Sequence, residues 1–122
     1  MEKDIFCKII DGELSSNVCY EDDKVKCIMD ITPVAPGHIL IIPKQHFTTI
    51  LDMDDATIVM IHNVAKKMIK KMESVLPNLI GVKVVVNYGS EQAVKHYHMH
   101  LLPYYEEKPT LTQEQICNML KE

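Results

Sequence analysis

The sequence predicts an α+β domain with a mostly antiparallel sheet of about five strands, one long helix and short terminal helices. Strand patterns come first, a single long amphipathic helix follows, and strand patterns then return. The 122 residues fit one domain, so residues 1–122 are treated as a single unit. The composition, 47% hydrophobic and 25% charged, is ordinary for a globular protein.

The first part of the chain is predicted to form a short helix and three strands. Residues 4–10 place apolar side chains on one side of a helix, which ends at Asp11-Gly12. The polar turn 21–24 joins two strands into a hairpin, and an irregular loop with Pro33, Pro36 and Gly37 precedes the third strand. The third strand is apolar throughout, is expected to be buried on both faces and ends at Pro43. The three predicted strands are Val18–Glu21, Val25–Met29 and His38–Ile42.

The long helix is predicted to begin at a cap, Asp52 or Asp54, and to continue to about residue 75. Its apolar residues recur every three or four positions, its lysines occupy the other faces, and Pro77 stops it. Two further strands, separated by the polar loop 88–95, and a short C-terminal helix at 111–120 complete the domain. These strands are Val82–Asn87 and His96–Leu102, the second closed by Pro103.

Charge and residue usage restrict the possible partners. The formal net charge is −4 with no basic block, which argues against nucleic acid as the main partner. Every basic residue is a lysine, so no arginine fork is available for a phosphate. A bound phosphate must therefore meet histidine, lysine or backbone N–H groups.

The sequence also predicts a cytoplasmic protein with reduced cysteines and no membrane segment. The four cysteines form no CxxC pair. The first residues are charged and lack the apolar run of a targeting signal, and no stretch approaches the length of a membrane span.

Three of the six histidines lie within five residues, at His96, His98 and His100. In a strand they would share one face, at intervals of roughly 6.5–7 Å. The side chains between and after them would point into the core: Tyr97, Met99 and Leu101. Three imidazoles in strict alternation favour a functional site over a histidine-rich exposed strand.

Imidazoles in this arrangement suit proton transfer and nucleophilic attack near neutral pH. One neutral ring can attack phosphorus while a neighbour protonates the leaving group. A zinc site is the second interpretation, because two or three histidines on one strand can bind the ion with a position left for water. The residues alone leave covalent catalysis and metal chemistry both open.

The segment His-Tyr-His-Met-His-Leu-Leu resembles the signature of the histidine-triad (HIT) superfamily. Further segments resemble its Hint branch, so that the likeness covers roughly residues 4–103 and leaves 104–122 as a C-terminal tail with a short helix. These segments follow the family order: Ile5–Glu13, Tyr20–Asp23, Asp30–Pro33, Pro36–His46 and Val85–Gly89.

The resemblance implies a homodimer with a continuous sheet and a hydrolase that cleaves bonds to the α-phosphate of nucleotides, without a metal or other cofactor. Hint-like substrates are purine nucleoside phosphoramidates, which yield a nucleoside monophosphate and an amine. His98 corresponds to the nucleophile, and His100 to the residue that contacts the phosphate and leaving group. His96 and His38 correspond to residues that support and orient the other two.

The resemblance also implies a nucleotide-binding set. Asp30 corresponds to the ligand of the ribose hydroxyls, and Asn87 to a polar contact near the phosphate. The expected apolar walls around the base are Leu14, Ile28 and Ile31. At Ala93 the Hint branch usually has Ser or Thr, so one hydroxyl contact to the phosphate region is missing, and Gln92 or Ser90 could compensate.

Two departures from the family bear on metals and activity. Zinc-binding members use a CxxC near the N-terminus plus two histidines, whereas here Cys7 is preceded by Asp4 at the first cysteine position, so no zinc of that type is expected. Ala93 and the short loop before the histidines keep a low-turnover nucleotide-binding or regulatory protein as an alternative. A dinucleoside polyphosphate hydrolase and a zinc-dependent hydrolase or storage module are the others.

Overall fold

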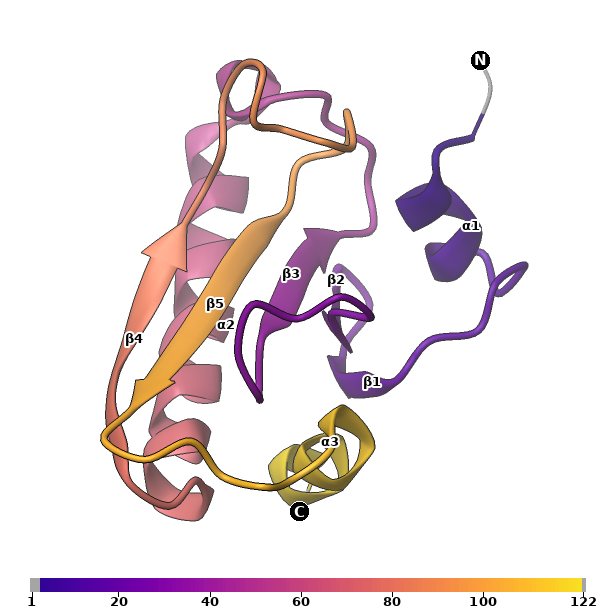
Figure 1. Ribbon diagram of the computed structural model, residues 1–122. Helices are drawn as coiled ribbons and strands as arrows, with labels where there is room; N and C mark the ends of the chain where they lie inside the picture. Colours follow the sequence, from indigo (N-terminus) through magenta and orange to yellow (C-terminus); the bar gives the residue numbers. More distant parts are fainter. Residues whose placement is uncertain (1–2, 122) are drawn as a thin grey trace.

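A computed structural model describes residues 3–121 of the chain, and Figure 1 shows the path of the backbone. Within these residues, five strands and three α-helices are joined by short loops and one 3-10 turn, η1. In chain order they are α1 (Ile5–Ile10), β1 (Val18–Glu21), β2 (Val25–Met29), β3 (Ile39–Pro43), η1 (Ile50–Asp52), α2 (Asp55–Val75), β4 (Leu79–Val85), β5 (Met99–Tyr105) and α3 (Gln113–Lys121).

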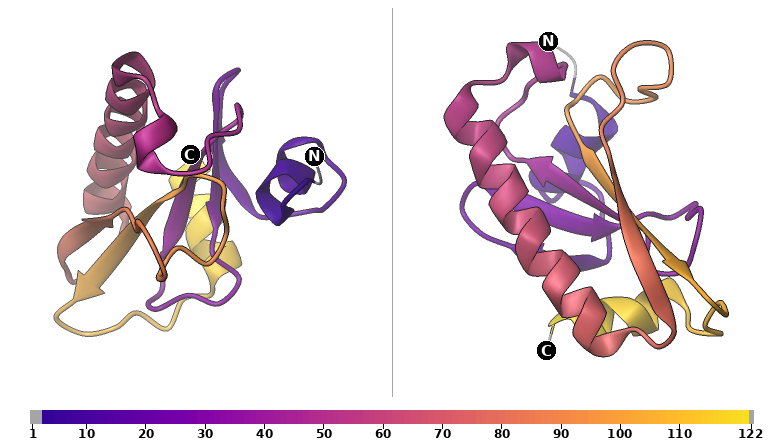
Figure 2. Two further views of the ribbon diagram at one scale, coloured as in Figure 1. Left: turned by 90° about the horizontal axis from the view of Figure 1, so that it is seen from above. Right: turned by 90° about the vertical axis from the view of Figure 1, so that its left-hand side faces the viewer.

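The five strands form one antiparallel sheet in the order β1-β2-β3-β5-β4. The long helix α2 lies along one face of the sheet, and α1 lies on the opposite side (Figure 2). The main core fills the space between the sheet, α2 and α3. A second apolar cluster lies under α1 and joins Phe6 and Ile9 to Ile28, Leu40 and Ile42. The predicted fold class is therefore confirmed.

Several local predictions are confirmed by the elements themselves. The first hairpin has the predicted bounds. β3 lies one residue later than the predicted His38–Ile42 and includes Pro43, and all five of its residues are buried, as predicted for an apolar run. The first helix ends before Asp11-Gly12 as predicted. The structure adds its cap, which was not predicted: the carboxylate of Asp4 accepts a hydrogen bond from the backbone N–H of Cys7. Asp54, one of the two candidate caps, accepts from the N–H of Thr57 at the start of α2.

The last two strands differ from the prediction in opposite directions: β4 lies nearer the N-terminus than predicted and β5 nearer the C-terminus, because the pairing between them sets their ends. β4 begins at Leu79 rather than Val82 and ends at Val85, since Asn78, with φ 60°, turns the chain straight from α2 into the sheet. β5 covers Met99–Tyr105 rather than His96–Leu102, because Leu79 pairs with Tyr105 and extends the ladder.

Pro103 thus lies inside β5 instead of closing it. Beyond Leu101, β5 has only β4 as a paired neighbour, so a residue without an N–H is tolerated there. At the other end, His96 and His98 lie before the strand, where the pairs of β5 with β3 and β4 have stopped. Of the three histidines, only His100 is within the ladder. Tyr97, Met99 and Leu101 point into the core as predicted.

Candidate active site

A largely apolar cavity of about 420 Å³ lies where α1, the end of β2 and the segment before β5 meet. Seven of the predicted site residues line it: Leu14, Ile28, Asp30, Ile31, Ala93, His98 and His100. Its size suits a small organic ligand. Sequence reasoning did not assign the α1 residues to this wall: Ile5, Phe6 and Ile9. Their apolar pattern indicated a helix face but not what the face would cover.

His98 is held in one tautomer at the wall of this cavity. Its Nδ1 lies 2.7 Å from the backbone carbonyl oxygen of His96, which can only accept, so Nδ1 carries the proton and Nε2 has a free lone pair. The ring of Phe6 packs edge-on against it, with centroids 4.9 Å apart. Burial lowers the pKa of His98 below its ordinary value, which keeps the ring neutral near pH 7. A neutral imidazole with a free Nε2 is a nucleophile.

His38 sets the tautomer of His100 in turn. The backbone N–H of Val34 donates to Nδ1 of His38 over 3.1 Å, so the proton of a neutral His38 is on Nε2. That Nε2–H lies 3.0 Å from Nδ1 of His100, which accepts it and keeps its own proton on Nε2. Burial and the neighbouring His98 and His38 lower the pKa of His100 to about 4. His100 is thus a neutral ring with a proton to donate, 4.9 Å from His98 between ring centroids.

Asp30 joins this pair from the loop after β2. Its Oδ2 lies 3.4 Å from Nε2 of His38, and its Oδ1 accepts from the N–H and hydroxyl of Thr32. Burial lowers the pKa of His38, and the charge of Asp30 opposes that shift only in part. The carboxylate borders the cavity beside the exposed side chain of Ile31.

His96 points to a different place from the other two histidines. Its Nε2–H donates to the carbonyl oxygen of Pro43 over 2.9 Å, and its Nδ1 lies 3.3 Å from Asp4 and 3.5 Å from the sulfur of Cys7. The expected common face of three rings is therefore wrong for His96, because the chain before β5 is outside the ladder. Its backbone carbonyl, not its ring, orients His98.

Four potential metal ligands converge on this side of His96. One atom each from Asp4, Cys7, His46 and His96 lies within 4.8 Å of the others. Oxygen, sulfur and nitrogen donors in this number suit zinc, and a ligating histidine that donates its other N–H to a carbonyl is typical of such sites. The residues present therefore fit the ion, although the substitution of Asp4 for a cysteine argued against it.

The same four residues also interact directly. Asp4 is within 3.1 Å of His46 and 3.3 Å of His96. Partial burial alone would raise the pKa of Asp4, but the N–H of Cys7 and the two imidazoles outweigh it and leave the pKa lowered. With or without an ion, this group ties α1 to the segment that carries His98.

Three predicted residues of the last loop lie in different surroundings. Ala93 lines the cavity, so the hydroxyl that the Hint branch usually has at this position is absent from the site itself. Gln92 is buried and donates from Nε2 to the carbonyl oxygen of Thr48, which makes it part of the loop framework. Asn87 follows the end of β4 and is not among the residues that line the cavity.

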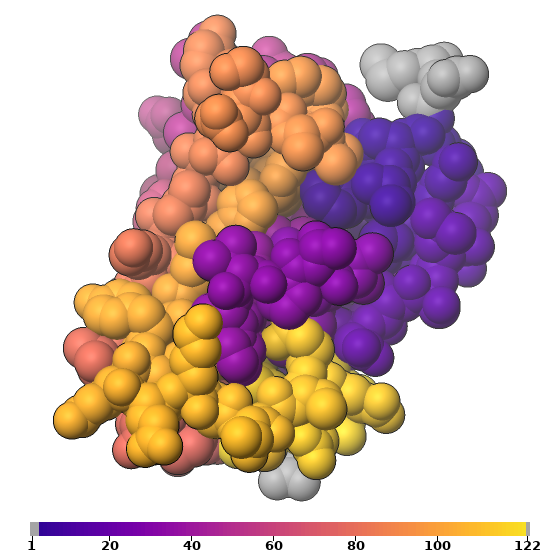
Figure 3. All heavy atoms as spheres, in the orientation of Figure 1, coloured from indigo at the N-terminus to yellow at the C-terminus, as the bar shows by residue number. Residues whose placement is uncertain are grey.

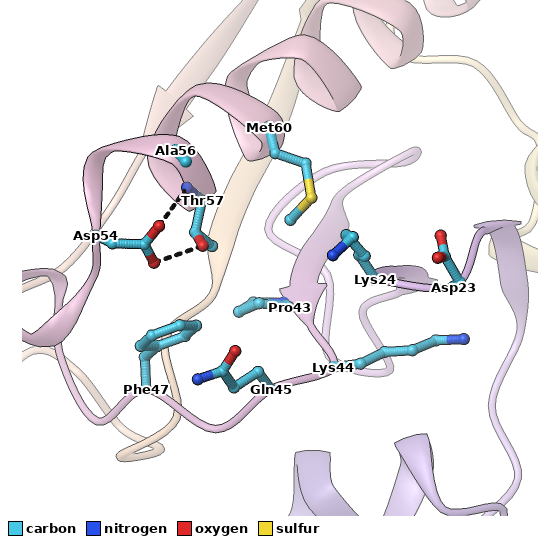
Figure 4. Close-up of a pocket in the computed structure, with 10 residues that line it drawn as sticks. All are labelled: Asp23, Lys24, Pro43, Lys44, Gln45, Phe47, Asp54, Ala56, Thr57 and Met60. Atoms are coloured by element: carbon cyan, nitrogen blue, oxygen red, sulfur yellow. Dashed lines mark hydrogen bonds between the residues drawn. The ribbon is translucent and has the colours of Figure 1, made fainter.

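A second hollow of about 600 Å³ lies near the end of β3 and the start of α2, and Figure 4 shows its side chains. Lys24, Lys44 and Gln45 border it together with Asp54, whose carboxylate is occupied by the N–H and hydroxyl of Thr57. None of its lining residues is a histidine or a cysteine. The chemistry described above therefore belongs to the smaller cavity.

The fold and the arrangement of neutral, hydrogen-bonded histidines define a protein of the histidine-triad class. The model of the HIT domain family matches residues 11–107, and the chain belongs to that family. An uncharacterized HIT-like protein of Borreliella burgdorferi is 39% identical over 84% of this chain and 76% of that protein. The adenosine 5′-monophosphoramidase of Candida albicans is 39% identical over 84% of this chain and 71% of its own length.

Solved structures agree with this assignment. A Hit-like protein involved in cell-cycle regulation from Bartonella henselae superposes with a TM-score of 0.88 at 34% identity, covering 98% of this chain and 95% of that one. A zinc-bound histidine triad family protein from Mycobacterium smegmatis gives a TM-score of 0.87 at 26% identity, covering 96% and 89%. No helix within residues 3–121 is both long and apolar enough to cross a membrane.

Proposed function

We propose that this HIT-family chain is a hydrolase that converts purine nucleoside phosphoramidates, such as adenosine phosphoramidate, into the nucleoside monophosphate and an amine. The observation that carries the proposal is the tautomer of His98: its Nδ1–H is engaged by the carbonyl of His96, which leaves the lone pair of Nε2 for attack. The monophosphoramidase of Candida albicans, 39% identical, supports this substrate class.

The reaction has two balanced steps. Nε2 of His98 attacks the α-phosphorus and the phosphorus–nitrogen bond of the substrate breaks. The leaving nitrogen accepts a hydrogen bond from the Nε2–H of His100 and departs as the amine with a proton taken from water. The hydroxide formed from that water then attacks the phosphorus of the nucleotidyl-His98 intermediate. The bond to His98 breaks, which releases the monophosphate and restores the neutral ring of His98.

Binding of the nucleoside follows from the cavity. The carboxylate of Asp30 accepts hydrogen bonds from the ribose hydroxyls, and the apolar walls at Leu14, Ile28 and Ile31 hold the base. Since the chain has no arginine, the imidazoles and backbone N–H groups of the cavity would be the partners of the phosphate. Ala93 removes a side-chain donor from this end of the cavity and favours slow turnover, which is the basis of the alternative role as a nucleotide-binding or regulatory protein.

We also propose that the chain acts as a homodimer paired along β4. This strand is an edge of the sheet, and its Ile80 and Val84 side chains are 60% and 47% exposed. An apolar edge strand is a site for pairing with another chain, and a second copy would extend the sheet across the two subunits.

The decisive test combines kinetics with trapping of the intermediate. The wild type, His98→Ala and His62→Ala are assayed on adenosine phosphoramidate and on diadenosine polyphosphates. We expect His98→Ala to lose about a thousandfold or more in kcat, while His62→Ala, an exposed histidine on α2, keeps wild-type turnover. Mass spectrometry after rapid quench should find one nucleotidyl group on His98.

Other results would change the assignment. Near wild-type turnover of His98→Ala would refute the covalent mechanism. Faster cleavage of the polyphosphates would move the substrate class, and tight AMP binding without turnover would support the regulatory role.

A further inference from the structure

The loop between β2 and β3 carries two site residues, one at each end. Asp30 begins the loop and His38 ends it, and the N–H of Asp30 donates to the carbonyl oxygen of His38 over 3.0 Å. Its interior residues are mostly exposed, so the shape of the loop depends on contacts at its base. The position of Asp30 relative to His38 therefore depends on what holds these two backbone segments together.

One side chain from the far end of the chain holds that base. The amide nitrogen of Gln113 donates to the carbonyl oxygens of Asp30 and His38 over 3.0 and 2.9 Å. Its amide oxygen accepts from the N–H of Gly37 over 2.6 Å. Three backbone groups of one loop thus meet a single planar amide. Figure 3 shows the purple atoms of the loop against the yellow atoms of the C-terminal segment.

Gln113 has a rigid support. It is the first residue of α3, whose Ile116, Cys117 and Leu120 are buried in the main core. The loop is also held from the sheet, because the hydroxyl of Tyr105 donates to the carbonyl oxygen of Pro36. Gln113 lies beyond residue 107, where the match to the HIT family ends.

We propose that Gln113 is a positioning residue of the active site, which fixes the carboxylate of Asp30 at the distance from His38 and His100 that the nucleoside requires. The proposal rests on the proposed function, since it assigns the ribose contact to Asp30. Gln113 acts through the backbone of the loop and touches no substrate itself. It makes the C-terminal helix part of the binding site of this chain.

The amide is the group that the site needs at this position. Both carbonyl oxygens require a donor, and the N–H of Gly37 requires an acceptor, so only a side chain with both functions satisfies all three. Gly37 has φ +89°, and a Cβ there would lie 3.0 Å from the hydroxyl of Tyr105 and 3.1 Å from the ring of Pro103. The loop is therefore confined on the sheet side and relies on Gln113 on the other.

The test compares the same substitution at two positions of one helix. Gln113→Glu keeps the acceptor and the shape but loses both N–H donors and sets a carboxylate against two carbonyls. Gln115→Glu is the matched control: it introduces the same charge two residues away, and this side chain accepts only from the N–H of Thr112. A negative charge at the start of a helix is favourable, so neither change weakens α3.

We expect Gln113→Glu to raise KM for adenosine phosphoramidate about tenfold, the effect of losing one or two hydrogen bonds. Gln115→Glu should stay within about twofold of the wild type, as exposed substitutions do. The rise in KM is the informative readout, because partial unfolding would lower kcat through the active fraction and leave KM unchanged. Hydrogen exchange of the amides of Asp30 and Val34, which donate to His38, should also become faster in Gln113→Glu alone.

The possible outcomes separate the two proposals. A KM of Gln113→Glu equal to that of the control, or loop amides that remain as protected as in the wild type, would overturn the role of Gln113. If the wild type lacks turnover, the proposed reaction fails, and calorimetry with AMP takes the place of KM. In that case a dissociation constant for AMP raised about tenfold supports the role of Gln113, and an unchanged one refutes it.

Discussion

His100→Asn should make the protein less sensitive to acid, because His100 is held neutral in the folded state. Burial and two neighbouring imidazoles lower its pKa to about 4, whereas the unfolded chain has a histidine pKa of 6.5. As pH falls below 6.5, this histidine binds a proton in the unfolded state but stays neutral in the folded state. Stability from this residue is therefore complete above pH 6.5 and declines until the pH reaches about 4.

The size of the effect follows from the shift. A change of this magnitude corresponds to at most about 3 kcal/mol. The ring is partly exposed to solvent, and screening reduces the figure to about 1–2 kcal/mol. For a domain of this size that free energy corresponds to roughly 4–8 °C in Tm. Asparagine is the appropriate replacement, because its amide oxygen can still accept the Nε2–H of His38.

The assay is thermal unfolding followed by circular dichroism at several pH values from 6.5 to 4, with a chelator present so that metal release does not contribute. The Tm of the wild type should fall further over this interval than that of His100→Asn. His62→Asn removes an exposed histidine and should behave like the wild type. Equal losses of Tm in His100→Asn and the wild type would refute the reasoning, since the burial of His100 would then have no influence on the acid response.

Three further predictions test other parts of the molecule. Ala93→Ser should raise kcat about tenfold with little change in KM, because the new hydroxyl would strengthen its contact as charge moves to the leaving group; equal kcat values would show that another group already fills the role. The wild type should sediment as a dimer of the 14.0 kDa chain, and Val84→Asp as a monomer; a wild-type monomer at micromolar concentration contradicts pairing along β4. Purified protein should retain one zinc per chain by metal analysis, and the cobalt-substituted protein should give a thiolate charge-transfer band. If Cys7→Ser kept both the zinc and the cobalt band, the four residues around His96 would be excluded as the metal site.

The histidine triplet shows how far the sequence could lead. Alternation around Tyr97, Met99 and Leu101 correctly predicted which side chains enter the core, and the family resemblance singled out His98 and His100. The sequence did not reveal that the paired part of β5 begins only at Met99, after His98. Strand ends depend on where the partner strands stop, and β4 and β5 both extend past the bounds that their own residues suggest. The direction of the His96 ring could not be predicted for the same reason.

Residues distant in sequence account for most of what was missed. Asp4 and His46 meet His96 only because α1 and the loop after β3 fold over the same end of the sheet. Phe6 belonged to an apolar helix face in the sequence, and the structure places its ring against His98. Gln113 had no distinguishing pattern, since its three partners are backbone groups of a loop some 75 to 83 positions away.

The sequence by itself determined the fold class, the family, the hairpin of β1 and β2, the cap of α2 to within two candidates, and the side chains able to carry the chemistry. These follow from periodicity, capping residues and motifs, which are local properties of the chain. The tertiary structure alone decided which ring nitrogen carries each proton, the separation of His96 from His98 and His100, and the support of Asp30 by α3. Each of these depends on backbone carbonyl and N–H groups brought together by the sheet, whose positions are fixed only when the whole domain is packed.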